Sequence, residues 1–125
     1  MFNIFKKGGL FEEIEHITPD EALKKISGEH KGNKTLIIDV REPHEFNGNL
    51  GHIENAESIP MRLLPAKIKE LEAYKDKEII AVCHSGARSH SACAMLKKHG
   101  FNKVYNLKGG MLLWKKFGFK SHTHI

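Results

Sequence analysis

The sequence contains little cysteine and no long hydrophobic run. Its 125 residues include only two cysteines, Cys83 and Cys93, which is too few for a disulfide scaffold. The longest apolar stretch, Ile79 to Cys83, has the length of a β-strand and falls far short of the roughly 20 residues that span a bilayer. We therefore expect neither a disulfide framework nor a transmembrane helix.

Acidic residues are missing from one part of the chain. Residues 79–125 hold eight Lys and Arg and no Asp or Glu, whereas residues 1–78 hold twelve basic and all fifteen acidic residues, so the halves carry +8 and −3. The lysines of the basic half are scattered and do not alternate with aromatic side chains, which disfavours nucleic-acid binding. A field of this sign attracts small anions if a site lies within it.

The length and the 40% apolar content predict one globular domain. The first residues do not resemble a secretory signal, because Lys6 and Lys7 follow the apolar residues and no apolar segment comes after them. We expect a cytoplasmic, monomeric protein that does not act at a membrane.

Strand-like and helix-like segments alternate along the chain. Apolar or β-branched runs predict strands at 14–17, 35–40, 56–59, 78–83 and 103–106, and capping signals or helical periodicity predict helices at 19–27, 43–47, 63–74, 87–99 and 111–117. This alternation predicts an α/β fold, a mainly parallel sheet of about five strands flanked by helices. We assign residues 1–13 to an irregular lead-in, 14–119 to the domain and 120–125 to a tail.

A short loop after the fourth predicted strand carries the strongest chemical signal. In parallel sheets ligands bind beyond the carboxyl ends of the strands, and Cys83 stands at such an end, directly before a predicted helix. Loop N–H groups and the helix N-terminus can hold a thiolate there. Gly86 permits a tight turn and Arg88 adds a positive charge. The alternative is a buried, inert thiol, and this is our interpretation of Cys93, which lies among apolar helix residues.

Metal ligands and cofactor motifs are not indicated. His122 and His124 lie close together in the tail, but no third ligand follows at a suitable spacing. We predict no metal site and no cofactor.

Four segments of the chain resemble the motifs of the rhodanese-like sulfurtransferase family, in the same order. They are Ile38-Asp39-Val40-Arg41-Glu42 with Glu45-Phe46, Gly51-His52-Ile53-Glu54-Asn55-Ala56 with Ile59-Pro60, Cys83-His84-Ser85-Gly86-Ala87-Arg88-Ser89, and Leu107-Lys108-Gly109-Gly110 with Trp114. The resemblance extends from about Ile14 to Phe119. It implies a single-domain rhodanese fold in which Cys83 takes a sulfane sulfur from a donor such as thiosulfate, becomes a persulfide and passes the sulfur to cyanide or a thiol.

The resemblance also implies roles for the residues around Cys83. The residues expected to bind substrate are His84, Ser85, Gly86, Ala87, Arg88 and Ser89, with Arg88 as the partner of a small anionic donor. Asp39 and Arg41 are expected to support the loops as a scaffold, as are Gly51 and His52. Gly109 and Gly110 are expected to allow close backbone approach to the loop, and Trp114 to lie in the core. A sulfur-accepting protein is a further expected partner.

Two other functions compete with this interpretation. Cysteine-dependent phosphatases and arsenate reductases need the spacing Cys-x5-Arg to surround a tetrahedral anion, whereas Cys83 and Arg88 are separated by four residues, which suits a single sulfur atom. The second competitor is a rhodanese-like module that relays sulfur or binds partners without free-standing activity, and the sequence leaves this alternative open.

Overall fold

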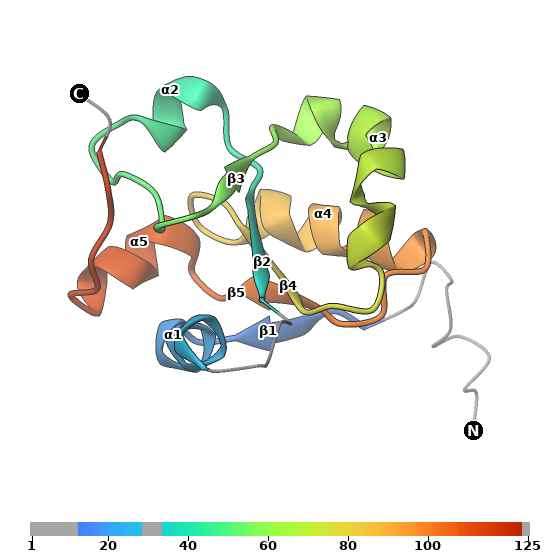
Figure 1. Cartoon of the computed structure of the whole chain (residues 1–125). Helices are drawn as coiled ribbons and strands as arrows, with labels where there is room; N and C mark the ends of the chain where they lie inside the picture. The colour runs from blue at the N-terminus through green and yellow to red at the C-terminus, as the bar shows by residue number, and fades with distance from the viewer. Residues whose placement is uncertain (1–12, 29–33, 124–125) are drawn as a thin grey trace.

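The computed structural model describes residues 13–28 and 34–123, which form a five-stranded sheet with strand order β1-β5-β4-β2-β3 (Figure 1). Every strand pair in it is parallel. The strands are β1 (Glu15–Ile17), β2 (Leu36–Asp39), β3 (Glu57–Ser58), β4 (Ile79–Val82) and β5 (Val104–Leu107). The predicted α/β class is confirmed. Most of the predicted lead-in, together with residues 29–33 and 124–125, lies outside the described residues.

Helices cover both faces of this sheet (Figure 1). They are α1 (Pro19–Ser27), α2 (Pro43–Phe46), α3 (Leu64–Lys67), α4 (Ala87–Lys98) and α5 (Gly110–Lys116), with 3₁₀ segments η2 (Met61–Leu63) and η3 (Lys69–Tyr74). Within β4, Ile79 and Ala81 pack in one core cluster with residues of α3, η3 and α4, and Ile80 and Val82 in the other with residues of α1 and α5. Burial on both faces explains why β4 is a continuous apolar run.

The start of α1 follows the predicted capping pattern. The Thr18 hydroxyl accepts from the Glu21 N–H at 3.4 Å, and Glu21 Oε1 accepts from the Thr18 N–H at 2.9 Å. Pro19 occupies the first helical turn, where no N–H is needed. These contacts form a capping box, and the predicted helix over 19–27 is confirmed.

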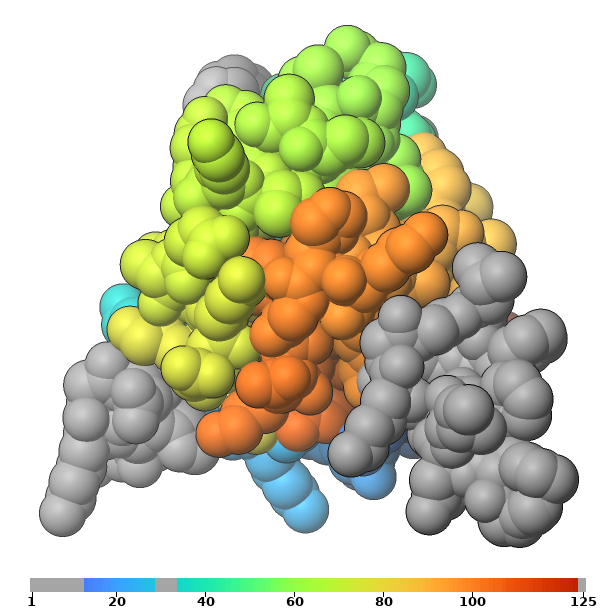
Figure 2. Space-filling model, turned by 90° about the vertical axis from the view of Figure 1, so that its right-hand side faces the viewer, coloured from blue at the N-terminus to red at the C-terminus, as the bar shows by residue number. Residues whose placement is uncertain are grey.

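The predicted helix over 63–74 is divided into shorter segments. The chain runs from η2 through α3 into η3, with Pro65 in the first turn of α3. Ile68, Leu71 and Tyr74 recur every three residues, which matches the three-residue turn of a 3₁₀-helix and keeps these side chains on the core. Figure 2 shows this segment alongside the C-terminal part of α4 on one face of the molecule.

The C-terminal segment folds back onto the domain. The indole N–H of Trp114 donates to the Lys120 carbonyl at 3.0 Å, and His122 exchanges two backbone hydrogen bonds of 2.8 Å with His52. The part of the predicted tail that the structure describes is therefore attached to the loop before β3. Within residues 13–28 and 34–123, no helix is both long and apolar enough to cross a bilayer.

Candidate active site

Cys83 follows the carboxyl end of β4, as the sequence predicts, and β4 is the central strand of the sheet. The loop turns through Gly86 at φ +110° and enters α4 at Ala87, and a positive φ of this kind favours glycine. The Cys83 residue is only 1% exposed. A reactant must therefore bring its reacting atom into the loop to reach the sulfur.

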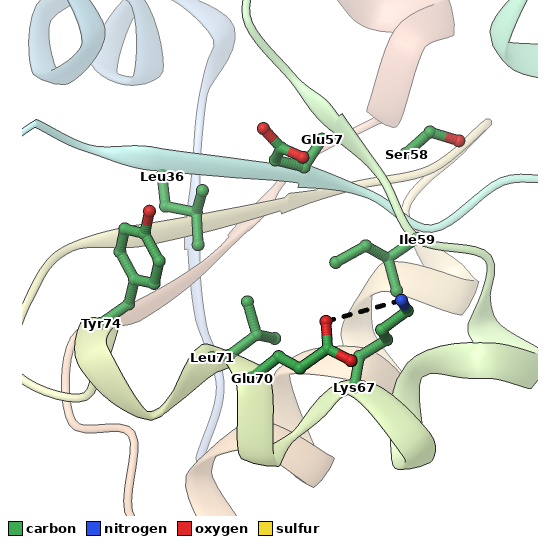
Figure 3. Close-up of a pocket in the computed structure, with 8 residues that line it drawn as sticks. All are labelled: Leu36, Glu57, Ser58, Ile59, Lys67, Glu70, Leu71 and Tyr74. Atoms are coloured by element: carbon green, nitrogen blue, oxygen red, sulfur yellow. Dashed lines mark ion pairs between the residues drawn. The ribbon is translucent and has the colours of Figure 1, made fainter.

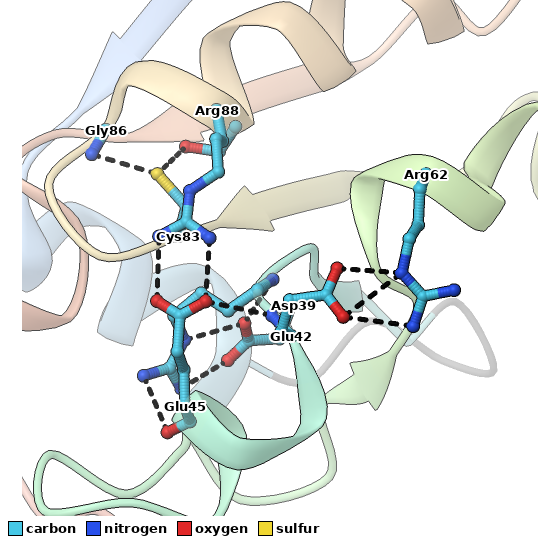
Figure 4. A network of polar contacts seen from close by, with 9 residues as sticks. Asp39, Glu42, Glu45, Arg62, Cys83, Gly86 and Arg88 are labelled. Carbon is cyan, nitrogen blue, oxygen red and sulfur yellow. Dashed lines mark hydrogen bonds and ion pairs between the residues drawn. The ribbon is translucent and has the colours of Figure 1, made fainter.

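Hydrogen-bond donors converge on this sulfur. The Gly86 N–H lies 3.0 Å from Cys83 Sγ and the Ser89 hydroxyl 3.3 Å from it (Figure 4). Burial acts to raise the pKa of Cys83, but the Ser89 hydroxyl and the N–H groups of Ser89, Gly86 and Ser85 together outweigh burial and lower the pKa. The arrangement favours a thiolate, which is the reactive form of cysteine.

Behind Ser89 stands a buried residue that the sequence analysis missed, Asn106 of β5. Its Oδ1 accepts a hydrogen bond from the Ser89 hydroxyl, and its Nδ2 donates to the Gly86 carbonyl at 3.0 Å. Asn106 thus holds both residues that contact the Cys83 sulfur. A polar residue inside the predicted strand 103–106 was the only signal for it in the sequence.

The start of α5 fixes the other side of the loop. The N–H groups of Met111 and Leu112 donate to the carbonyls of Cys83 and His84 at 2.9 and 3.1 Å. A Cβ atom on Gly110 would lie 2.4 Å from the Cys83 oxygen and 2.5 Å from the His84 oxygen. The predicted close backbone approach is confirmed at Gly110, whereas a Cβ on Gly109 would meet the Leu113 side chain. These two hydrogen bonds hold the Cys83 loop against the start of α5.

Arg88 makes a contact that the sequence analysis did not predict. Its two terminal nitrogens donate to the carboxylate of Glu45 in α2 at 2.7 and 2.8 Å (Figure 4). The Arg88 hydrogen bond lowers the pKa of Glu45 to about 2. Glu45 belongs to the first of the four motif segments, but its distance from Arg88 in the sequence concealed the pair.

Asp39 and Arg41 form a buried ion pair, each side chain being 1% exposed. Arg41 donates to both Asp39 oxygens, at 2.9 and 2.7 Å, and to the carbonyls of Gly51 and Glu45 at 2.7 and 3.1 Å. These contacts join β2 to α2 and to the loop before β3. They are the contacts that the scaffold interpretation expects.

The remaining loop residues lie at the surface. His84, Ser85 and Ala87 are exposed, and His84 also lines a cavity of about 330 Å³ together with residues of α2 and the following loop. A second cavity, of about 290 Å³, lies between β3 and η3, where the Lys67–Glu70 ion pair is part of its wall (Figure 3). No residue of the Cys83 loop lines the second cavity, so it is separate from the candidate active site.

Cys93 is buried like Cys83, but its pKa is shifted in the opposite direction. It is fully buried in α4, and this burial raises its pKa to about 12. The interpretation of Cys93 as a small core side chain is confirmed. Among the described residues no group of three or more His, Cys, Asp or Glu could hold a metal ion, and His124 lies outside them.

Comparison with known proteins agrees with this geometry. Residues 18–117 match the rhodanese-like domain family. A sulfurtransferase of Allochromatium vinosum is 40% identical over 83 residues, which cover 66% of this chain and 74% of that protein. The tRNA uridine(34) hydroxylase of Escherichia coli is 40% identical over 81 residues, 62% of this chain but only 23% of the hydroxylase.

The solved structures point to the same family. The rhodanese-related protein of Thermoplasma volcanium superposes with a TM-score of 0.72 at 30% identity, covering 85% of this chain and 95% of that one. The family match covers most of the chain and includes β2, β4, the Cys83 loop and α5. The chain therefore belongs to the rhodanese-like domain family, whose relatives include sulfurtransferases.

Proposed function

We propose that the protein is a rhodanese-type sulfurtransferase that carries sulfur as a persulfide on Cys83. The observation that supports this most directly is the pair of donors, Gly86 N–H and Ser89 hydroxyl, at 3.0 and 3.3 Å from Cys83 Sγ. Such preorganised donors stabilise negative charge on a sulfur atom without further rearrangement. The same donors can serve a thiolate before transfer and a persulfide after it.

The proposed reaction has two transfers. The Cys83 thiolate attacks the outer sulfur of a donor such as thiosulfate, the S–S bond of the donor breaks, and sulfite leaves with the bonding electrons. An acceptor thiolate or cyanide then attacks the terminal sulfur of the Cys83 persulfide and restores the Cys83 thiolate. His84, Ser85 and Ala87 are proposed to contact the substrates, because they are exposed around the buried sulfur.

A relay role is the second candidate. In the hydroxylase of Escherichia coli the matching region is 23% of the protein, so a region similar to this chain can be one part of a longer protein. For this chain the acceptor is then a protein. Both cysteines are free thiols, and for either function we propose that the protein works in a reducing compartment, the cytoplasm. We also propose that it is a monomer.

Intact mass spectrometry of the full chain tests the proposal. The protein is reduced, incubated with thiosulfate and treated with cyanide, beside Cys83→Ser and Cys93→Ser variants. We expect a gain of about one sulfur atom that requires Cys83, does not require Cys93 and disappears with cyanide. Loading from a persulfide but not from thiosulfate favours the relay role, and loading from neither overturns the proposal.

A further inference from the structure

Arg88, in the first turn of α4, is already paired with a carboxylate. Glu45 accepts from both of its terminal nitrogens at 2.7 and 2.8 Å. A bidentate pair of this kind directs both charges at each other. Figure 4 shows the guanidinium pointing towards Glu45 in α2, away from the donors that bind the sulfur. A substrate anion that binds Arg88 must therefore displace Glu45 or share Arg88 with it.

The other two arginines of the sequence are paired in the same way. Arg41 is bound to Asp39 at 2.7 Å and Arg62 to Glu42 at 3.0 Å. Figure 4 shows the Arg62–Glu42 pair together with the Arg88–Glu45 pair. No arginine of the chain thus offers an unpaired guanidinium to an incoming anion.

The two classes of sulfur donor differ in charge. Thiosulfate carries two negative charges and approaches the Cys83 thiolate, beside which the positive charge of Arg88 is balanced by the Glu45 carboxylate. A persulfide of a small thiol, R–S–SH or its anion, carries at most one negative charge on the reacting group. At the short distances within a partly buried site, each additional like charge raises the free energy of the encounter by an amount that matters for binding.

The neighbouring cavity suits a donor with a carbon skeleton. It has a volume of about 330 Å³ and adjoins the loop through His84 and α2 through Glu45. Its other lining residues include His44, Asn49 and Leu50, which supply both polar and apolar contacts. Thiosulfate has no group that could occupy this space, whereas the organic part of a small persulfide does.

We propose that Glu45, by neutralising Arg88, makes the site select persulfides of small thiols over the thiosulfate dianion. The inference rests on the proposed sulfurtransferase function. In the transfer, the Cys83 thiolate attacks the outer sulfur of R–S–SH, the S–S bond breaks and R–S⁻ leaves with the bonding electrons, so Cys83–S–SH forms without net oxidation. Glu45 acts through Arg88 and is therefore a positioning residue.

The test compares two donors on the full chain. Rates of Cys83 persulfidation are measured by rapid quenching and intact mass, as a function of donor concentration, with sodium thiosulfate and with cysteine persulfide. The variant is Glu45→Gln, whose amide oxygen can still accept from the Glu42 N–H that now bonds Glu45 at 3.0 Å. The matched control is Glu42→Gln, which removes the same charge from the Arg62 pair.

In the wild type we expect faster loading from cysteine persulfide. Glu45→Gln should raise the second-order rate constant for thiosulfate about tenfold, the effect of about 1.4 kcal/mol, mainly through a lower half-saturating concentration. The constant for cysteine persulfide should change by less than about twofold on the same scale. Glu42→Gln should leave the ratio of the two donors unchanged.

Two results overturn the inference while the proposed function stands: an unchanged donor ratio in Glu45→Gln, or an equal loss for both donors, which indicates a merely structural role. Loading of the wild type from neither donor instead overturns the proposed function. If Glu45→Gln does not fold, salt dependence in the wild type decides. We expect thiosulfate loading to gain on cysteine persulfide loading between about 0.02 and 0.3 M NaCl, because salt screens the repulsion of the dianion, and a selective loss of thiosulfate loading would reveal an unpaired cation.

Discussion

The Ser89 hydroxyl lies 3.3 Å from the Cys83 sulfur and is held there by a hydrogen bond to Asn106 Oδ1. The hydroxyl has one hydrogen, so it can donate to only one of these two acceptors at a time. When Cys83 is a thiolate, the sulfur is the stronger acceptor because it carries the charge. The state of Cys83 is therefore coupled to a residue of the neighbouring strand.

Replacing Ser89 by alanine should raise the pKa of Cys83. The Ser89 hydroxyl is the strongest of the contacts that lower this pKa against the effect of burial. A higher pKa lowers the thiolate fraction, and with it the rate of alkylation, at a pH below the pKa. The rate of Cys83 alkylation as a function of pH measures the shift. Ser91→Ala, an exposed change in the same helix, is the control, and equal profiles for both variants would contradict the prediction.

Asn106→Ala should affect both stability and reactivity. The substitution removes the acceptor of Ser89 and the donor to the Gly86 carbonyl, both buried or half-buried contacts. We expect a loss of about 1–3 kcal/mol in the free energy of unfolding. We also expect a lower pKa of Cys83, because the Ser89 hydroxyl then keeps the Cys83 sulfur as its acceptor. Urea denaturation and alkylation measure the two effects. Asn102→Ala, at an exposed position, should change neither, and a Cys83 pKa that rises in Asn106→Ala would contradict the competition for the Ser89 hydroxyl.

Gly110→Ala should be more harmful than Gly118→Ala. Both glycines have positive φ, +57° and +80°, but a Cβ on Gly110 meets the Cys83 and His84 oxygens whereas one on Gly118 meets nothing within 4 Å. Backbone strain alone should cost Gly118→Ala about 1 kcal/mol. Gly110→Ala should lose at least about 2 kcal/mol more and slow sulfur loading. Urea unfolding compares the two, and equal losses would show that the close approach is unimportant.

Asp39→Asn should be strongly destabilising. The substitution leaves Arg41 as a buried, uncompensated cation, and breaking such a pair costs about 3–5 kcal/mol. Glu42→Gln breaks the Arg62 pair, in which the side chains are 62% and 33% exposed, and pairs at the surface contribute less than about 1 kcal/mol. Denaturant unfolding of both variants measures the difference. Similar losses would contradict the scaffold interpretation of Asp39 and Arg41.

The contribution of the Glu45–Arg88 pair to the free energy of unfolding should decrease at low pH. Its pKa is lowered by the Arg88 hydrogen bond from 4.5 to about 2 in the folded protein. A lowered folded pKa means that the pair stabilises the protein above the unfolded pKa and that this contribution is lost as the pH falls through the folded pKa. The difference in unfolding free energy between the wild type and Glu45→Gln should therefore shrink between about pH 4.5 and 2. A difference that is constant over this range would contradict the prediction.

Features that depend on neighbouring residues could be predicted from the sequence. The capping box at Thr18, the apolar run of β4, the Cys83 loop and the position of Gly86 before α4 all arise from local backbone hydrogen bonding and burial patterns. These features were enough to predict the α/β class and the candidate nucleophile. The segment 61–74 was an exception, because Ile68, Leu71 and Tyr74 fit three residues per turn and the sequence analysis assumed a regular helix.

Which side chains meet around Cys83 is determined by the tertiary structure. Glu45 is 43 residues from Arg88, and Asn106 is 17 residues from Ser89. The order β5-β4-β2 brings these partners together at the carboxyl ends of the strands. Local sequence patterns do not indicate this order. Charge pairing and buried hydrogen bonds act across space, so the electrostatic character of the site follows from the packing of strands that are distant in the sequence.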